Sequence, residues 1–202
     1  MEPSPELRAH PAFAGLNAQQ IEQLENYLAL LVKWNARVNL TAVREPTEIV
    51  DRHFAESIFA ARQIPSRVKT LLDFGSGAGL PGIPIAIARP EIGVTLAESQ
   101  NKKAAFLREA VRTLGLKTEV WAARVEEMAP EHVFDAVTLR AVDKMAEACR
   151  TAVDRLVLGG WIAVFATRKT EPAVEGLVGI RWEADVAIPG SEQGILKMGV
   201  RA

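Results

Sequence analysis

The stretch Asp73-Phe74-Gly75-Ser76-Gly77-Ala78-Gly79-Leu80-Pro81-Gly82 decides the fold of this chain. It follows an apolar run at 68–72 and precedes another at 83–88, which predicts a strand, a glycine turn and the start of a helix. Glycines at alternating positions let the backbone turn sharply and let a ligand lie close against it, with the helix N-terminus behind. The sequence therefore predicts a site for a nucleotide-like ligand at this turn.

Two kinds of cofactor fit this turn. Residues 77–82 satisfy the dinucleotide pattern G-x-G-x-x-G, and Glu98 lies about 20 residues further on, where a ribose acceptor is expected. Asp73 favours the other interpretation, because an acid two residues before the first glycine resembles the motif of class I S-adenosylmethionine-dependent methyltransferases. S-adenosylmethionine has no pyrophosphate but carries a sulfonium and an ammonium group. A pocket that bears an acid suits it better than it suits a dinucleotide.

Composition predicts a soluble globular protein with one sizeable core. The 202 residues are 49% hydrophobic and 24% charged, and the formal net charge of −1 neither supports nor excludes a nucleic-acid partner. No apolar run reaches the length of a membrane span, and the start of the chain lacks the features of a secretory signal, so we expect a cytoplasmic protein with no membrane partner. The lone Cys149 and the three histidines show no ligand spacing, so no metal is expected.

Hydrophobic periodicity divides the chain into an N-terminal helical extension, residues 1–64, and an α/β domain, residues 65–202. In the extension, Asn17 is expected to cap a helix that runs to about Val38, and a second helix is expected from Pro46 to about Arg62. The α/β domain is expected to form a doubly wound, mostly parallel seven-stranded sheet of the Rossmann-like kind. Its expected strands are 68–72, 92–97, 118–122, 134–139, 161–166, 182–188 and 194–200, and its later helices are 101–114, 145–158 and 171–177. Gly115 is expected to end the helix at 101–114, and Gly159-Gly160 is expected to form the turn after the helix at 145–158.

The ends of four predicted strands indicate where a ligand would lie. Ligands of open α/β sheets bind at the carboxyl ends of the strands, where the loops converge. The predicted pocket is therefore made of residues 73–80, 98–100 and 124–126, together with Arg140.

Several stretches beyond the glycine turn occur together in an order that resembles one family. They are Lys33-Trp34-Asn35, Val38 to Ala42, Arg52 to Ser57, Asp73 to Pro84, Arg124 to Glu127, and Phe134-Asp135 followed by Leu139-Arg140-Ala141. Over nearly its whole length the chain is similar to the bacterial ribosomal RNA small subunit methyltransferase G family, also called glucose-inhibited division protein B. The resemblance implies a class I methyltransferase fold and a monomer. It also implies transfer of a methyl group from S-adenosylmethionine to N7 of one guanosine in the 16S RNA of the small ribosomal subunit.

Two alternative functions stay open on the residues alone. One is a small-molecule methyltransferase with the same fold, and the other is a nicotinamide-dependent oxidoreductase that uses residues 77–82.

The predicted pocket and the resemblance together give a set of cofactor contacts. Glu98 is expected to accept hydrogen bonds from both ribose hydroxyls or, alternatively, to cap the next helix. Leu80 and Val125 are expected to enclose the adenine ring, with Glu126 near its amine. Asp73 is expected to orient either the amides of the turn or the ligand's ammonium group. The candidates for cofactor binding are Asp73, Gly75, Gly77, Gly79, Leu80, Glu98, Ser99, Gln100, Val125, Glu126 and Arg140.

The implied reaction asks for alignment rather than for proton transfer, because guanine N7 carries a free lone pair at neutral pH. Arg140 is the candidate for this alignment, since its guanidinium can fork to a phosphate or to the O6 and N7 edge of guanine. The family commonly has a lysine-glycine pair where this chain reads Thr167-Arg168-Lys169-Thr170, so the role of Lys169 stays open. Trp34 and Asn35 are expected in the core. The candidates for RNA binding are Arg52, His53, Arg124, Arg168 and Lys169.

Overall fold

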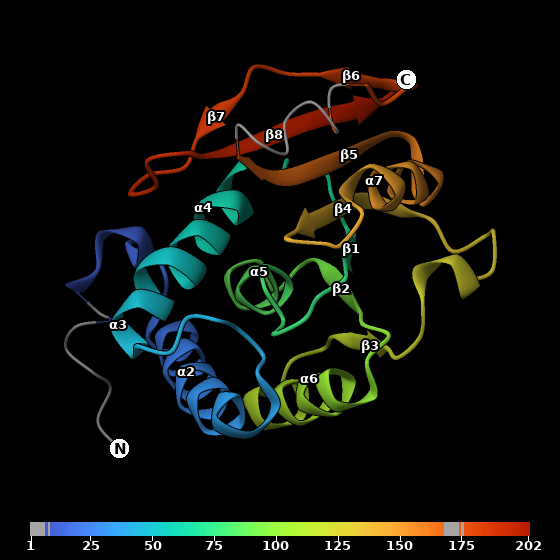
Figure 1. The fold of residues 1–202 in the computed structure, drawn as a ribbon. Helices are drawn as coiled ribbons and strands as arrows, with labels where there is room; N and C mark the ends of the chain where they lie inside the picture. Colours follow the sequence, from blue (N-terminus) through green and yellow to red (C-terminus); the bar gives the residue numbers. More distant parts are fainter. Residues whose placement is uncertain (1–6, 8, 168–173, 175) are drawn as a thin grey trace.

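The chain forms one mixed sheet with helices on both faces, as the sequence predicted (Figure 1). This computed structural model describes residues 9–167 and 176–202, together with Leu7 and Val174. The described strands are β1 (Thr70–Phe74), β2 (Gly93–Ala97), β3 (Glu119–Trp121), β4 (Phe134–Arg140), β5 (Leu156–Thr167), β6 (Ile180–Trp182), β7 (Val186–Ala187) and β8 (Gly194–Arg201).

The strand order places a switch point at the centre of the sheet. The order is β3-β2-β1-β4-β5-β8-β6, and β7 also pairs with β8. Strands β1 to β5 are parallel, whereas β8 is antiparallel to β5 and pairs antiparallel with β6 and β7. The chain therefore leaves β1 toward β2 and β3 and returns to add β4 on the other side of β1, which opens a crevice at the carboxyl ends of these strands. The doubly wound, mostly parallel class is confirmed.

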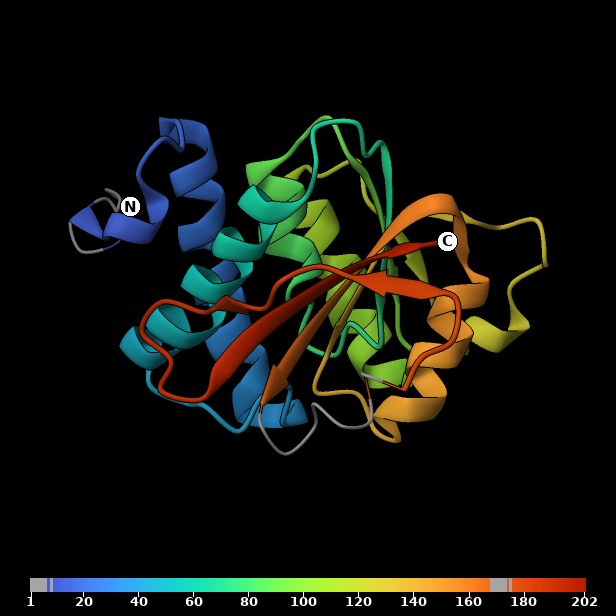
Figure 2. The same ribbon diagram turned by 90° about the horizontal axis from the view of Figure 1, so that it is seen from above.

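Helices cover both faces of the sheet (Figure 2). In the described residues, α2, α4, α5 and α6 pack with Leu71, Val94 and Leu96 on one face, and α7 packs with Leu72 and Val137 on the other. None of the described helices is long and apolar enough to cross a bilayer. The α-helices are α2 (Ala18–Val38), α3 (Pro46–Glu48), α4 (Ala55–Gln63), α5 (Gly82–Ala88), α6 (Asn101–Leu114) and α7 (Met145–Asp154), and the short helical segments are η1 (Pro11–Phe13), η2 (Ile49–Phe54) and η3 (Val125–Glu127).

The described part of the N-terminal extension folds as the short η1 and two longer helical stretches, which share a core with the sheet domain. Asn17 accepts a hydrogen bond from the Gln20 amide at 2.9 Å while the Gln20 side chain accepts one from the Asn17 amide, so the predicted cap of α2 is confirmed. The predicted second helix is continuous from α3 through η2 to α4, but η2 is π-helical. Such segments put an extra residue into a turn and are frequent at functional sites.

The predicted helix at 145–158 is too long by one turn. It ends at Asp154, and β5 begins at Leu156 and runs through the two glycines that were expected to form the turn. Gly160 has no room for a side chain, because a Cβ there would lie 2.8 Å from the Val157 carbonyl oxygen. The glycines instead allow an irregularity in the pairing of β4 with β5 between Phe134 and Ala136.

The predicted strand at 182–188 is wrong in detail, because it is divided into β6 and β7, and the described part of the chain forms a sheet of eight strands rather than seven. The interruption contains Asp185, whose carboxylate lies 3.0 Å from the ammonium of Lys197 on β8. The Lys197 side chain is buried, and a buried ammonium needs a carboxylate beside it. The backbone leaves the ladder where this pair forms. The predicted helix at 171–177 falls mostly outside the described residues.

Candidate active site

One cavity of about 680 Å³ opens at the carboxyl ends of β1, β2 and β4, where the switch point predicts it. Its first wall is the glycine turn together with the loops after β2 and β3. The rest of its lining comes from the loop after β4 and from the N-terminal extension. The lining residues from the extension are Leu40, Thr41 and His53.

The glycine turn has no room for a side chain at Gly79 but has open space at Gly77. A Cβ at Gly79, where φ is +85°, would collide with the side chain of Ile83. At Gly77, by contrast, a Cβ would meet only the Gly75 carbonyl oxygen, at 3.8 Å. Because Gly77 lines the cavity, this open space is a cradle in which a ligand can approach the backbone. The turn therefore fits a nucleoside cofactor.

Asp73 holds the turn from beneath. Its side chain is buried, with one oxygen accepting a hydrogen bond from the Gly82 amide at 3.1 Å and the other accepting one from the Thr138 hydroxyl at 2.8 Å. Burial raises the pKa of the Asp73 carboxyl to about 6. Asp73 does not line the cavity, so its expected contact with the ligand's ammonium stays a prediction, whereas its contact with a turn amide is present.

Tyr27 holds the same turn from the N-terminal extension. Its hydroxyl donates to the Ala78 carbonyl oxygen at 2.5 Å, and its ring stacks on Phe54 with centroids 4.9 Å apart and planes at 4°. Burial raises the pKa of this phenol well above its usual value, so the group stays a donor. Sequence reasoning missed Tyr27. The available signal was a hydroxyl on the apolar face of α2, three residues after Leu24 and four before Leu31.

Glu98 joins the turn to the start of α6. One of its carboxylate oxygens accepts a hydrogen bond from the Gly77 amide at 3.0 Å, and the other accepts one from the Gln100 amide at 2.7 Å. Gln100 occupies the N-cap position of α6, and its side chain makes no capping hydrogen bond. Glu98 therefore holds the backbone at the start of α6, as the capping interpretation predicted. A carboxylate has about four lone-pair positions, so both oxygens can also accept from a ligand. Its expected role at the ribose stays a prediction.

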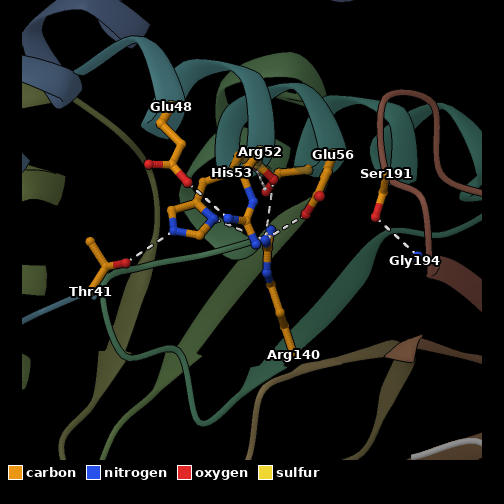
Figure 3. Close-up of polar contacts among 9 residues, drawn as sticks. Thr41, Glu48, Arg52, His53, Glu56, Arg140, Ser191 and Gly194 are labelled. Carbon is orange, nitrogen blue, oxygen red and sulfur yellow. Dashed lines mark hydrogen bonds and ion pairs between the residues drawn. The ribbon is translucent and has the colours of Figure 1, made fainter. Parts of the chain in front are cut away.

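Arg140 reaches from the end of β4 into the N-terminal extension rather than into open space (Figure 3). Its Nη2 donates to the Glu56 carboxylate at 2.5 Å, to His53 Nδ1 at 2.9 Å and to the Arg52 carbonyl oxygen at 3.2 Å. Its guanidinium carbon also lies 5.1 Å from the centre of the Phe165 ring. Burial lowers the pKa of Arg140 and raises that of Glu56, while each charge opposes the shift of the other.

His53 lies between Arg140 and Thr41 and is neutral at pH 7. Burial, then the charges of Arg140 and Arg52, lower its pKa to about 4. A guanidinium has no acceptor atom, so Nδ1 must be the acceptor and the ring proton must be on Nε2. This Nε2–H donates to the Thr41 hydroxyl oxygen, which lies 3.0 Å away (Figure 3).

A family model for rRNA small subunit methyltransferase G matches residues 20–174, which include every residue that lines the cavity. The chain belongs to this family. A ribosomal RNA small subunit methyltransferase G of Laribacter hongkongensis is 39% identical over an alignment of 204 positions that covers 97% of this chain and 98% of that protein. One of Xanthomonas axonopodis is 48% identical over 138 residues, 65% of this chain and 64% of the relative. A solved structure described as a predicted O-methyltransferase of Agrobacterium tumefaciens has a similar fold, with a TM-score of 0.61 and 22% identity over 73% of this chain and 80% of that chain.

In this member of the rRNA small subunit methyltransferase G family, most of the predicted cofactor residues meet at one cavity. Leu80 and Val125 are buried apolar parts of its wall, and Glu126 lies exposed at its rim. Gly79 and Asp73 do not line the cavity: Gly79 is a part of the turn that packs against Ile83, and Asp73 accepts a hydrogen bond from the turn. The remaining predicted residues that line the cavity are Gly75, Gly77, Glu98, Ser99, Gln100 and Arg140.

The RNA-binding candidates have different surroundings. Arg124 and His53 line the cavity, whereas Arg52 is exposed and pairs with Glu48 at 2.8 Å. Arg168 and Lys169 lie outside the described residues, and all five stay predictions for RNA contact. Asn35 is in the core as expected, and Trp34 is partly buried and packs against the core. Trp34 packs edge-on against Phe106, with ring centroids 5.7 Å apart, and Asn35 is buried.

Removal of the Tyr27 hydroxyl tests whether the extension supports the cofactor turn. We expect Tyr27→Phe to weaken S-adenosylmethionine binding roughly fivefold, because the Ala78 carbonyl loses its donor while the ring stack is kept. Calorimetric titration measures the Kd. The matched control is Gln23→Met, one turn earlier on α2, which removes a hydrogen bond to Leu114 and should leave the Kd unchanged. Equal losses in both variants would contradict the role of Tyr27.

The buried neutral His53 predicts a pH dependence of stability. Its folded pKa of about 4 lies below the ordinary histidine pKa of 6.5, so the unfolded chain gains a proton first as the pH falls, and stability is lost between these values. We expect wild type to lose about 2 to 3 kcal/mol relative to His53→Gln between pH 7.5 and pH 4. Urea unfolding at each pH measures the free energy of unfolding of both proteins. Glu56 and Asp73 titrate in both, so their contributions cancel in the difference between the two free energies. If the free energy of unfolding of wild type and of His53→Gln changed equally with pH, His53 would not be the group responsible.

Proposed function

We propose that this chain transfers the methyl group of S-adenosylmethionine to N7 of a guanosine in the 16S RNA of the small ribosomal subunit. Membership of the rRNA small subunit methyltransferase G family is the observation that carries the proposal. The cavity supports it, because the glycine cradle and Glu98 lie at the switch point where a nucleoside cofactor binds in this fold.

The chain's own residues align the reactants and need not move a proton. When bound, the cofactor supplies an electrophilic methyl group, and guanine N7 supplies a lone pair that is free at neutral pH. Both ring nitrogens of His53 are engaged, with Arg140 and with Thr41, so His53 is not placed as a general base. Leu80 and Val125 exclude water from one wall, and the held turn fixes the cofactor's position. Alignment in a dry cavity is what such a displacement requires.

Family membership decides between the alternatives that the sequence left open. The G-x-G-x-x-G pattern at residues 77–82 also suits a nicotinamide dinucleotide, but the family is one of methyltransferases. A small-molecule methyltransferase would share the cofactor wall. The family name and the relative of Laribacter hongkongensis, which aligns over 98% of its length, favour ribosomal RNA as the acceptor.

The proposed function is tested by incubating small ribosomal subunits from a strain that lacks this modification with the protein and methyl-labelled S-adenosylmethionine. We expect label in 16S RNA, at N7 of a single guanosine, located by cleavage at the modified base. Subunits and the RNA extracted from them are both assayed. Absence of label from both, with the protein binding the cofactor, would defeat the proposal.

Substitution of Glu98 tests its predicted contact with the cofactor. Glu98→Ala leaves the Gly77 and Gln100 amides without their acceptor and removes the expected partner of the ribose. We expect the Kd for S-adenosylmethionine to rise at least tenfold, because hydrogen bonds to charged groups are each worth about 1.5 to 3 kcal/mol. Calorimetric titration measures binding, and circular dichroism checks the fold. Glu22→Ala, at an exposed position of α2 that does not line the cavity, is the control. A Kd unchanged in a folded Glu98→Ala protein would exclude the ribose role.

A further inference from the structure

Thr41 and His53 of the N-terminal extension line the cavity together with Arg140, which is hydrogen-bonded to His53, and these three residues form one wall of it. An acceptor base would have to lie in this cavity of about 680 Å³, beside the cofactor, to meet the methyl group. The hydrogen-bonding groups of that wall therefore decide which base fits.

The direction of every hydrogen bond along this wall is fixed. Glu56 can only accept, so Arg140 donates to it, and Arg140 can only donate to His53 Nδ1. The neutral ring of His53 must then donate from Nε2 to the Thr41 oxygen, and the Val43 amide donates to the same oxygen at 3.2 Å. The hydroxyl oxygen of Thr41 is thus an acceptor twice. Among the described residues no acceptor remains for its own proton.

The backbone that carries Thr41 is held firmly. Asn35 is buried, and its side chain accepts from the Thr41 amide at 3.0 Å and donates to the Val43 carbonyl oxygen at 3.2 Å. Asn39 ends α2 in the left-handed conformation, with φ of 49°, which turns the chain toward the cavity. The Thr41 hydroxyl is therefore a donor whose position is fixed before any ligand arrives.

We propose that the Thr41 hydroxyl, oriented by the series Glu56, Arg140 and His53, donates a hydrogen bond to O6 of the acceptor guanine. This inference rests on the proposed function, whose acceptor atom N7 lies next to O6 on the same edge of the base. Adenine has an amine in place of O6, so a fixed donor at this position faces another donor when adenine enters. An unmatched buried pair of donors is unfavourable, so the wall selects guanine over adenine.

The test compares Thr41→Val with Thr41→Ser in methyl transfer to undermethylated small ribosomal subunits. Valine keeps the shape of threonine but has no hydroxyl, whereas serine keeps the hydroxyl and loses the methyl group. We expect Thr41→Val to lower kcat/KM for the subunit roughly tenfold, with the Kd for S-adenosylmethionine within about twofold of wild type. Thr41→Ser should keep most of the activity. The control Thr47→Val replaces an exposed threonine of the extension outside the cavity and should equal wild type.

Each other result would overturn the inference. Unchanged kcat/KM in Thr41→Val would show that the hydroxyl contacts no part of the substrate. Equal losses in the valine and serine variants would assign the effect to shape, and a parallel rise in the cofactor Kd would place the hydroxyl at the cofactor instead. Failure of the proposed function would look different, because the wild-type protein itself would then bind S-adenosylmethionine but transfer no label to ribosomal RNA.

Discussion

The backbone of the glycine turn is hydrogen-bonded from three directions, and the active site depends on this constraint. Asp73 binds the Gly82 amide, Glu98 binds the Gly77 amide, and Tyr27 binds the Ala78 carbonyl oxygen. A turn rich in glycine loses much conformational entropy on folding, so its own sequence does not hold it in one shape. Partners from the first strand, the second strand and the N-terminal extension supply that shape. The cradle exists only because three separate elements meet there.

The N-terminal extension is therefore part of the site as well as a covering for one face of the sheet. Helix α2 brings Tyr27 to the cofactor turn, and the stretch from η2 to α4 brings His53 and Glu56 to Arg140 at the end of β4. The pair of Arg140 and Glu56 is mostly buried, with side chains 15% and 12% exposed. Loss of one partner would leave a buried charge without compensation, which costs more than the intact pair contributes. The pair thus fixes where the extension meets the strand rather than adding much stability.

The sequence predicted those features that depend on residues close together in the chain. The cap at Asn17 and the end of α6 at Gly115, which has φ of 63°, both follow local rules and are confirmed. Gly159 and Gly160 were misread, because the same pair of glycines fits a turn after a helix and an irregular strand. Tyr27 and Ala78 are 51 residues apart, and Arg140 and Glu56 are 84 apart. Periodicity contains no information about which of many polar side chains will meet at such distances.

Helix α2 supports two parts of the cavity lining. The glycine turn proposed to hold the cofactor is bound by α2, and the loop that carries Thr41 follows the end of α2 and is bound by Asn35 of the same helix. A shift of α2 would therefore move the proposed cofactor contact and the proposed acceptor contact together. Methyl transfer requires the methyl group and the acceptor atom to be aligned within a fraction of an ångström, about 3 Å apart. Support of both walls by one helix fixes this separation more directly than two independently mobile loops would.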